Sequence, residues 1–238
     1  MKPTHTSLFA RATRYSESAK ATPRENRLTE CFAGVLERVE GLAVDLAVSW
    51  LDPDSSSRGV GEVSRRSTAD LHSLLTNSPY ALTGVRTQIR TSVGKFVDLE
   101  LRFGSPEEAA TDIVVWVEVK HGTGLHDEQA LSYRASLRAL HPGPHDMPVV
   151  ILGRQSDLDP YGDQVPDDSP LRSWDRVGGR IRTLRDEPEL FDDPVDRWLM
   201  QEFLTFLREE GLMPRSDLAP STSPHSPTTA RRKRLWRI

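Results

Sequence analysis

A chain of 238 residues, 37% hydrophobic and 28% charged, is long enough for one sizeable globular domain with appendages. The formal net charge of −4 argues against a histone-like protein that coats nucleic acid through bulk charge, although an enzyme with a local basic groove is compatible with it. No apolar run reaches the roughly 20 residues of a membrane span, and no apolar stretch typical of a signal peptide follows Met1. With Cys31 as the single cysteine, an internal disulfide is excluded, and we expect a cytoplasmic protein with no membrane partner.

The first predicted helix follows a polar lead-in at residues 1–22 that shows no clear periodicity. Pro23 opens a helical pattern, which Gly41 is suited to end. One apolar stripe runs along this helix: Leu28, Phe32, Val35, Leu36 and Val39. Residues 42–51 form a second apolar segment, and residues 52–57 are interpreted as a loop.

A β-hairpin is predicted next, because the pattern changes to a period of two from residue 83. Gly94-Lys95 suggests the turn, and residues 96–103 form the second strand. This strand places Asp98 and Glu100 on one face. Its other face is apolar: Val97, Leu99, Leu101 and Phe103.

The third predicted strand, residues 112–120, is rich in β-branched side chains. One face is apolar throughout: Ile113, Val115, Val117 and Val119. Glu118 and Lys120 share the opposite face at the carboxyl end of the strand. Antiparallel pairing with the hairpin would bring Asp98 beside Glu118, and so gather two carboxylates and an ammonium group at one point.

Residues 127–141 are predicted to form a helix that Asp127 could cap, and residues 147–152 a short buried strand. The order helix, three strands, helix, strand predicts an α/β fold with a mixed sheet covered by helices on both sides. A short helix is expected next, on the pattern of Leu171, Trp174 and Val177.

The last predicted helix begins at Asp193-Pro194 and ends at Gly211. We therefore place one domain at residues 23–213. Residues 214–238 are interpreted as a disordered basic tail, because a Pro-, Ser- and Thr-rich segment precedes the basic run at residues 231–237.

The acidic cluster suits metal-assisted hydrolysis of a phosphodiester. Carboxylates bind Mg²⁺, which lowers the pKa of a bound water, and a lysine can orient that water. The alternative is a surface ion pair on an exposed strand, since Glu-X-Lys is common by chance. The apolar strand around Glu118 and Lys120 and the acidic strand before it favour the functional interpretation.

These motifs resemble those of the PD-(D/E)XK nuclease superfamily. Residues 97–101, Val-Asp-Leu-Glu-Leu, resemble its first acidic motif, with Val97 in place of the proline, and Glu118-Val119-Lys120 resembles its (D/E)XK motif. The resemblance implies a restriction-endonuclease-like fold with an α-β-β-β-α-β core. It also implies that Asp98, Glu118 and Lys120 are catalytic, with Asp98 and Glu118 as ligands of Mg²⁺ or Mn²⁺.

Three further residues belong to this resemblance. Some members carry an acidic residue on the first core helix, which makes Glu30 a fourth catalytic and metal-binding candidate; the alternative is a solvated helix face. Gln129 and Tyr133 are similar to a glutamine and tyrosine found on the helix after the (D/E)XK strand. As i, i+4 neighbours they would meet on one face, which ordinary amphipathic packing explains equally well.

Positive charge on the hairpin could contact a nucleic acid. Arg86 and Arg90 share a face and could line a groove, and Glu100 is a further candidate near the substrate. A solvated strand face is the alternative.

The function expected from these observations is metal-dependent cleavage of DNA in preference to RNA, as an endonuclease in phage (antiviral) defence, restriction or repair. The rival is a catalytically inactive module with the nuclease fold that binds nucleic acid or a protein partner. A homo-oligomer is compatible with the sequence.

Overall fold

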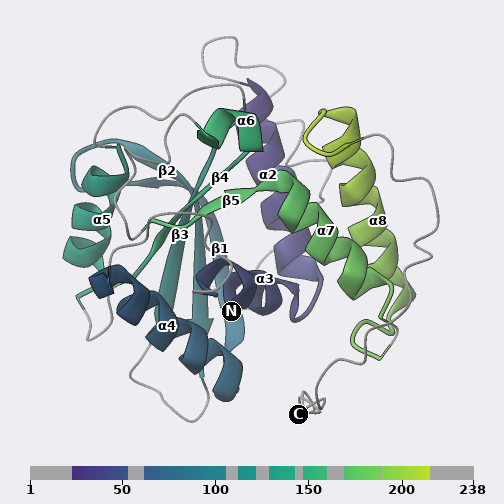
Figure 1. Cartoon of the computed structure of the whole chain (residues 1–238), viewed down its shortest axis with the longest axis horizontal. Coiled ribbons are helices and arrows are strands. Elements are labelled where there is room, and N and C mark those ends of the chain that lie inside the picture. Colours follow the sequence, from purple (N-terminus) through teal and green to yellow (C-terminus); the bar gives the residue numbers. More distant parts are fainter. Residues whose placement is uncertain are drawn as a thin grey trace.

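A mixed five-stranded sheet forms the centre of the fold (Figure 1). The computed structural model describes residues 23–52, 62–105, 112–121, 129–142, 147–159, 169–187 and 189–214. The predicted lead-in at residues 1–22 and the predicted tail beyond residue 214 lie outside this description. In sheet order, the strands are β1 (Ala81–Arg90), β2 (Phe96–Gly104), β3 (Ile113–Val119), β4 (Val149–Gly153) and β5 (Leu171–Ser173).

The sheet is antiparallel on one side of β3 and parallel on the other. Strand β2 pairs antiparallel with β1 and β3, whereas β4 pairs in parallel with β3 and β5. Helix α5 (Gln129–Leu140) lies between β3 and β4 in the chain, as a parallel connection requires. The predicted α/β fold with a mixed sheet is thereby confirmed.

The remaining helices are α2 (Pro23–Arg38), α3 (Leu42–Leu51), α4 (Glu62–Asn77), α6 (Gln155–Leu158), α7 (Trp174–Arg185) and α8 (Pro194–Glu209). Figure 1 shows α5 on one side of the sheet and α2, α7 and α8 on the other. None of the helices among the described residues is long and apolar enough to cross a membrane.

The central strands β3 and β4 are buried on both faces, so the fold has two cores. A large core lies between the sheet and helices α2, α3, α4, α7 and α8, and a small core lies under α5. Strand β3 belongs to both, with Val115 and Val117 in the large core and Val114 and Trp116 in the small one. Burial on both faces explains its nearly continuous apolar sequence.

Aromatic contacts in the large core hold α2 in place. The ring of Phe32 stacks on Phe203 of α8 at a centroid distance of 5.3 Å and meets Trp174 of α7 edge to face, also at 5.3 Å. Such pairs stabilise a core by about 0.5–1.5 kcal/mol beyond the burial of their area. Helix α2 is therefore fixed against α7 and α8, which matters because its first turns carry polar side chains of the candidate site.

The predicted elements agree with the structure at most positions. The hairpin turns at residues 91–95, where Gly94 adopts the left-handed conformation with φ 79°, although β1 already ends at Arg90. Asp193 caps α8 by accepting a hydrogen bond from the backbone N–H of Val195 at 2.7 Å. Asp127, the expected cap of α5, lies outside the described residues.

Three elements differ from the prediction, and one of them, the four-residue helix α6, is too short for a helical period to show in the sequence. Helix α4 was not predicted, because its sequence is largely polar and its apolar face depends on a few leucines such as Leu71 and Leu75. Leu171, expected in a short helix, instead pairs with Ile151 as the first residue of β5, and the helix begins at Trp174. A three-residue strand is too short to show alternation in the sequence.

Two adjacent glycines of α7 provide a test of this packing. A methyl group on Gly178 would lie 2.2 Å from the sulfur of Met213, whereas one on Gly179 would have nothing within 4 Å. We predict that Gly179→Ala raises the free energy of unfolding by about 0.5–1 kcal/mol, because glycine costs more conformational entropy than alanine in a helix.

The matched variant Gly178→Ala must displace Met213 and should be less stable than Gly179→Ala by at least about 1 kcal/mol. Urea unfolding of both variants measures the difference. Equal stabilities would show that the segment after α8 does not pack on α7.

Candidate active site

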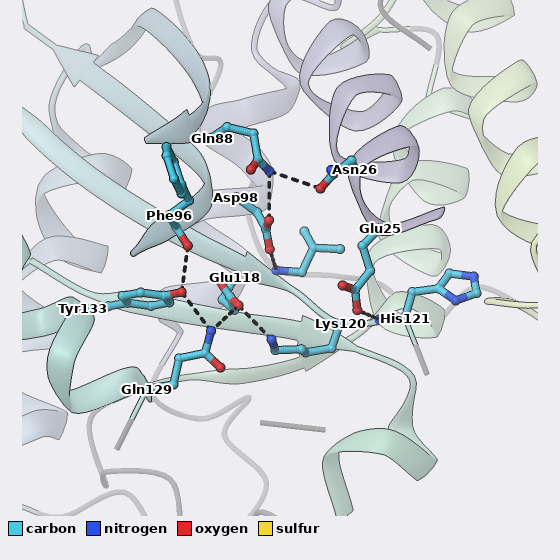
Figure 2. A network of polar contacts seen from close by, with 11 residues as sticks. Glu25, Asn26, Gln88, Phe96, Asp98, Glu118, Lys120, His121, Gln129 and Tyr133 are labelled. Carbon is cyan, nitrogen blue, oxygen red and sulfur yellow. Dashed lines mark hydrogen bonds and ion pairs between the residues drawn. The ribbon is translucent and has the colours of Figure 1, made fainter. Parts of the chain in front are cut away.

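The register of the sheet brings Asp98 and Glu118 together. Leu99 of β2 pairs with Val117 of β3, so the next positions on the two antiparallel strands, Asp98 and Glu118, lie opposite each other. The Asp98 carboxylate accepts a hydrogen bond from the backbone N–H of Val119 at 2.8 Å. The predicted juxtaposition of the two carboxylates is thus present, at the carboxyl end of β3 (Figure 2).

Lys120 and two residues of α5 surround Glu118. Its Oε1 accepts hydrogen bonds from Nζ of Lys120 at 2.8 Å and from the amide of Gln129 at 2.6 Å. The Gln129 amide also donates to the hydroxyl of Tyr133 at 2.8 Å, which donates to the carbonyl of Phe96 at 2.7 Å (Figure 2). The structure therefore joins Gln129 and Tyr133 to the predicted cluster.

This ion pair is not on the surface. Glu118 is 4% exposed and Lys120 is 7% exposed. Burial of charged groups is costly unless they are paired. The alternative of a chance ion pair on an exposed strand is therefore wrong for Glu118 and Lys120.

Burial sets the protonation of the two carboxylates. Burial, together with the charge of Asp98, raises the pKa of Glu118 to about 8, although Lys120 opposes the shift. Burial likewise raises the pKa of Asp98 to about 6, although the Val119 N–H and the charge of Lys120 act against it. One lysine therefore does not fully offset two carboxylates in a site of low polarity.

Helix α2 contributes a third acid, Glu25. Its Oε1 accepts a hydrogen bond at 2.8 Å from the backbone N–H of His121, the residue after Lys120. The negative charge of Glu25 also raises the pKa values of both Asp98 and Glu118. Glu25 was not among the predicted site residues, because its position in the first turn of the helix is its only signal in the sequence.

Glu30, the acid predicted on the same helix, lies elsewhere. It is five residues further along α2, roughly 7.5 Å along the axis, and it accepts a hydrogen bond from the hydroxyl of Thr87 on β1. Its side chain is buried, so the solvated helix face weighed as an alternative is wrong. Its role in metal binding stays a prediction.

Gln88 connects Asp98 to helix α2 (Figure 2). Its amide donates to Asp98 at 3.1 Å and to the side-chain oxygen of Asn26 at 3.3 Å. Gln88 is the one described residue other than glycine with a positive φ, 53°, in the left-handed region that such side chains seldom adopt. Such conformations cost free energy and are typical of functional sites, where neighbouring contacts hold them.

The unusual backbone of Gln88 coincides with a change of face in the hairpin. On one side of it, Thr87 contacts α2 and its partner Leu99 packs in the large core. On the other side, the pair Ile89 and Val97 packs in the small core. The hairpin thus changes face near Asp98, whose carboxylate accepts hydrogen bonds from the backbone of β3 and from Gln88, which also reaches Asn26 of α2.

Glu100 and the hairpin arginines form a separate group. The buried Glu100 carboxylate accepts hydrogen bonds from the Trp116 indole at 2.9 Å and from Arg102 at 2.8 Å, and Arg86 lies at 3.4 Å. Burial would raise the pKa of Glu100, but these hydrogen bonds and the charges of Arg102 and Arg86 outweigh it and lower the pKa. Glu100 is thus paired within this group and its place near a substrate stays a prediction, while the side chain of Arg90 is exposed.

The donor set limits how a metal ion could be held. No group of three His, Cys, Asp or Glu side chains within the described ranges is arranged to hold one. The two carboxylates nevertheless offer oxygen atoms: Oε2 of Glu118 is buried and has no hydrogen-bond partner among the described residues. Each oxygen of Asp98 accepts one hydrogen bond, from Gln88 or from the backbone of Val119, and has a second lone pair. Cys31, by contrast, is a poor candidate for catalysis, because burial raises the pKa of its thiol to about 11.

The raised pKa values predict how stability depends on pH. A carboxyl group with a higher pKa in the folded state binds its proton more tightly there, so its stabilising contribution is lost as the pH rises through the folded value. In EDTA, the free energy of unfolding should therefore fall between about pH 5 and pH 8.

Glu118→Gln should make that fall shallower, and Glu202→Gln on the exposed side of α8 should not. Thermal unfolding across this pH range measures both. The same pH dependence in wild type and Glu118→Gln would contradict the assigned protonation.

Comparisons with known proteins add nothing to this geometry. No protein-family model, curated protein or solved structure matches the chain significantly. The arrangement of Asp98, Glu118 and Lys120 is therefore the basis on which a function has to be inferred.

Proposed function

We propose that this chain is a metal-dependent nuclease of the PD-(D/E)XK type that hydrolyses phosphodiester bonds in DNA. The observation that carries the proposal is the position of the half-buried Asp98 opposite the buried Glu118, which is paired with the buried Lys120. The raised pKa values of these two carboxyl groups indicate that the positive charge around them is too small to balance their negative charges. A bound divalent cation would supply the missing positive charge.

The residues present fit a magnesium ion. Mg²⁺ is commonly held by one or two carboxylates, with water and substrate phosphate completing its octahedral shell. Asp98 would be one ligand and Oε2 of Glu118 the other, because the second oxygen of Glu118 is occupied by Lys120 and Gln129. Mn²⁺ has similar ligand preferences and is expected to substitute.

The proposed roles follow from these contacts. A bound magnesium ion supplies a water of lowered pKa and neutralises negative charge on the phosphate. Lys120 orients the attacking water and stabilises the charge that develops on the phosphate. Gln129 and Tyr133 do not contact the substrate in this proposal. Gln129 fixes the carboxylate of Glu118 by its hydrogen bond, and Tyr133 holds the amide of Gln129 in place.

One observation favours the rival, a nuclease-fold module without activity. Lys120 and Glu118 already form an ion pair at 2.8 Å, and both oxygens of Asp98 accept hydrogen bonds. A polar network of this kind can be purely structural. Such a module would bind DNA or a protein partner without needing Mg²⁺, so metal dependence separates the two functions.

The test is a cleavage assay on supercoiled, linear and single-stranded DNA, with RNA in parallel, in Mg²⁺, Mn²⁺ or EDTA. We expect cleavage of DNA that requires the metal and that falls at least about a hundredfold in Glu118→Gln and in Lys120→Ala. The two variants should differ in calorimetry, since Lys120→Ala retains metal binding and Glu118→Gln weakens it.

The control is Glu202→Gln, which removes an exposed carboxylate of α8 and should cleave like wild type. DNA binding without cleavage in any metal would instead support the inactive module. Cleavage by Glu118→Gln at the wild-type rate would mean that the active site lies elsewhere.

Two glutamates of α2 form a second matched pair. We predict that Glu25→Gln weakens Mg²⁺ binding, because the charge of Glu25 acts on both carboxylates. Glu30→Gln perturbs the contact with Thr87 and should mainly lower the melting temperature. Titration calorimetry and thermal unfolding of both variants decide between them, and the opposite pattern would make Glu30 the acid that α2 contributes to the site.

A further inference from the structure

The turn between β1 and β2 is fastened to the candidate active site. The hydroxyl of Ser92 lies 2.9 Å from that of Ser136 on α5. Tyr133, on the same helix, donates to the carbonyl of Phe96 and accepts from Gln129, the partner of Glu118. Contacts at both ends of the turn therefore hold its position relative to the two carboxylates.

This turn nevertheless exposes large apolar side chains. Val93 is 61% exposed and Phe96 is 53% exposed. The neighbouring Val97 is buried in the small core, so Phe96 points away from α5, as its ring in Figure 2 shows. Phe96 is two residues from Asp98 on the same strand, which places their Cα atoms roughly 7 Å apart.

A positive charge accompanies the exposed ring. Arg90 is the register partner of Phe96 on β1, and its side chain is exposed. Lys95, just before Phe96, is exposed as well. An aromatic face beside exposed cations complements a ligand that carries both a flat π surface and negative charge.

We propose that Phe96 stacks on an unpaired base of the substrate strand, with Arg90 beside the neighbouring phosphate. This inference rests on the proposed nuclease function and narrows its substrate: a base can stack on Phe96 only when it has left its duplex. The favoured substrate is single-stranded DNA or a frayed or mismatched end, in preference to fully paired duplex.

The experiment uses single-stranded oligonucleotides of one sequence, each with one abasic nucleotide at a different position. Wild type should bind one of them about tenfold or more weakly, since stacking on one base contributes on that scale. Phe96→Ala should bind the intact oligonucleotide with an affinity reduced by the same factor. Its affinity should not depend on where the abasic nucleotide lies. Phe96→Trp should restore both affinity and sensitivity, and Val93→Ala should behave like wild type.

Binding is measured by fluorescence anisotropy in Ca²⁺, and cleavage in Mg²⁺, so the inference and the proposed function can fail separately. Cleavage by wild type together with unchanged binding by Phe96→Ala would overturn the role of Phe96 alone. If wild type shows the expected dependence on the abasic position but does not cleave DNA, the stacking role of Phe96 is supported and the proposed nuclease activity is wrong. A third outcome would also overturn the inference: wild type is a dimer, Phe96→Ala is a monomer, and both bind DNA equally well. The turn would then be a contact surface for a second copy of the chain.

Discussion

The central constraint in this structure is the close approach of two carboxylates with little access to solvent, the half-buried Asp98 of β2 and the buried Glu118 of β3. Their negative charges face each other in a site where water screens them poorly, and Lys120 supplies one positive charge. Raised pKa values are the result. Such an arrangement lowers the stability of the folded protein. Strongly perturbed carboxyl groups are typical of sites that bind or transform a ligand.

Much of the fold is arranged around these two side chains. The large core fixes α2 through Phe32, and α2 in turn supplies Glu25 and Asn26. The small core fixes α5, which supplies Gln129 and Tyr133. The cluster therefore lies where elements from both faces of the sheet converge, and the left-handed conformation of Gln88 allows the hairpin to reach it.

The central strand and its chemistry could be predicted from the sequence, because period-two alternation separates Glu118 and Lys120 from the apolar face of β3. Pairing with the hairpin then placed Asp98. Three features could not be predicted. Helix α4 is polar, and the short elements β5 and α6 show no period.

The third feature concerns which polar side chains of one helix reach the site. Glu25 and Glu30 lie on the same helix, and helical spacing alone did not show that Glu25 acts on Asp98 and Glu118. That choice depends on the angle at which α2 crosses the sheet. The contact of Gln88 depends on a backbone conformation that its residue type does not favour.

The most direct test of a cation held by these carboxylates is the anomalous difference map of a crystal soaked in Mn²⁺. We expect a peak within coordination distance of Asp98 and Oε2 of Glu118, roughly 2.2 Å from each oxygen. A map with no peak there, in crystals where Lys120 remains paired with Glu118 and Mn²⁺ is present in excess, would contradict this expectation.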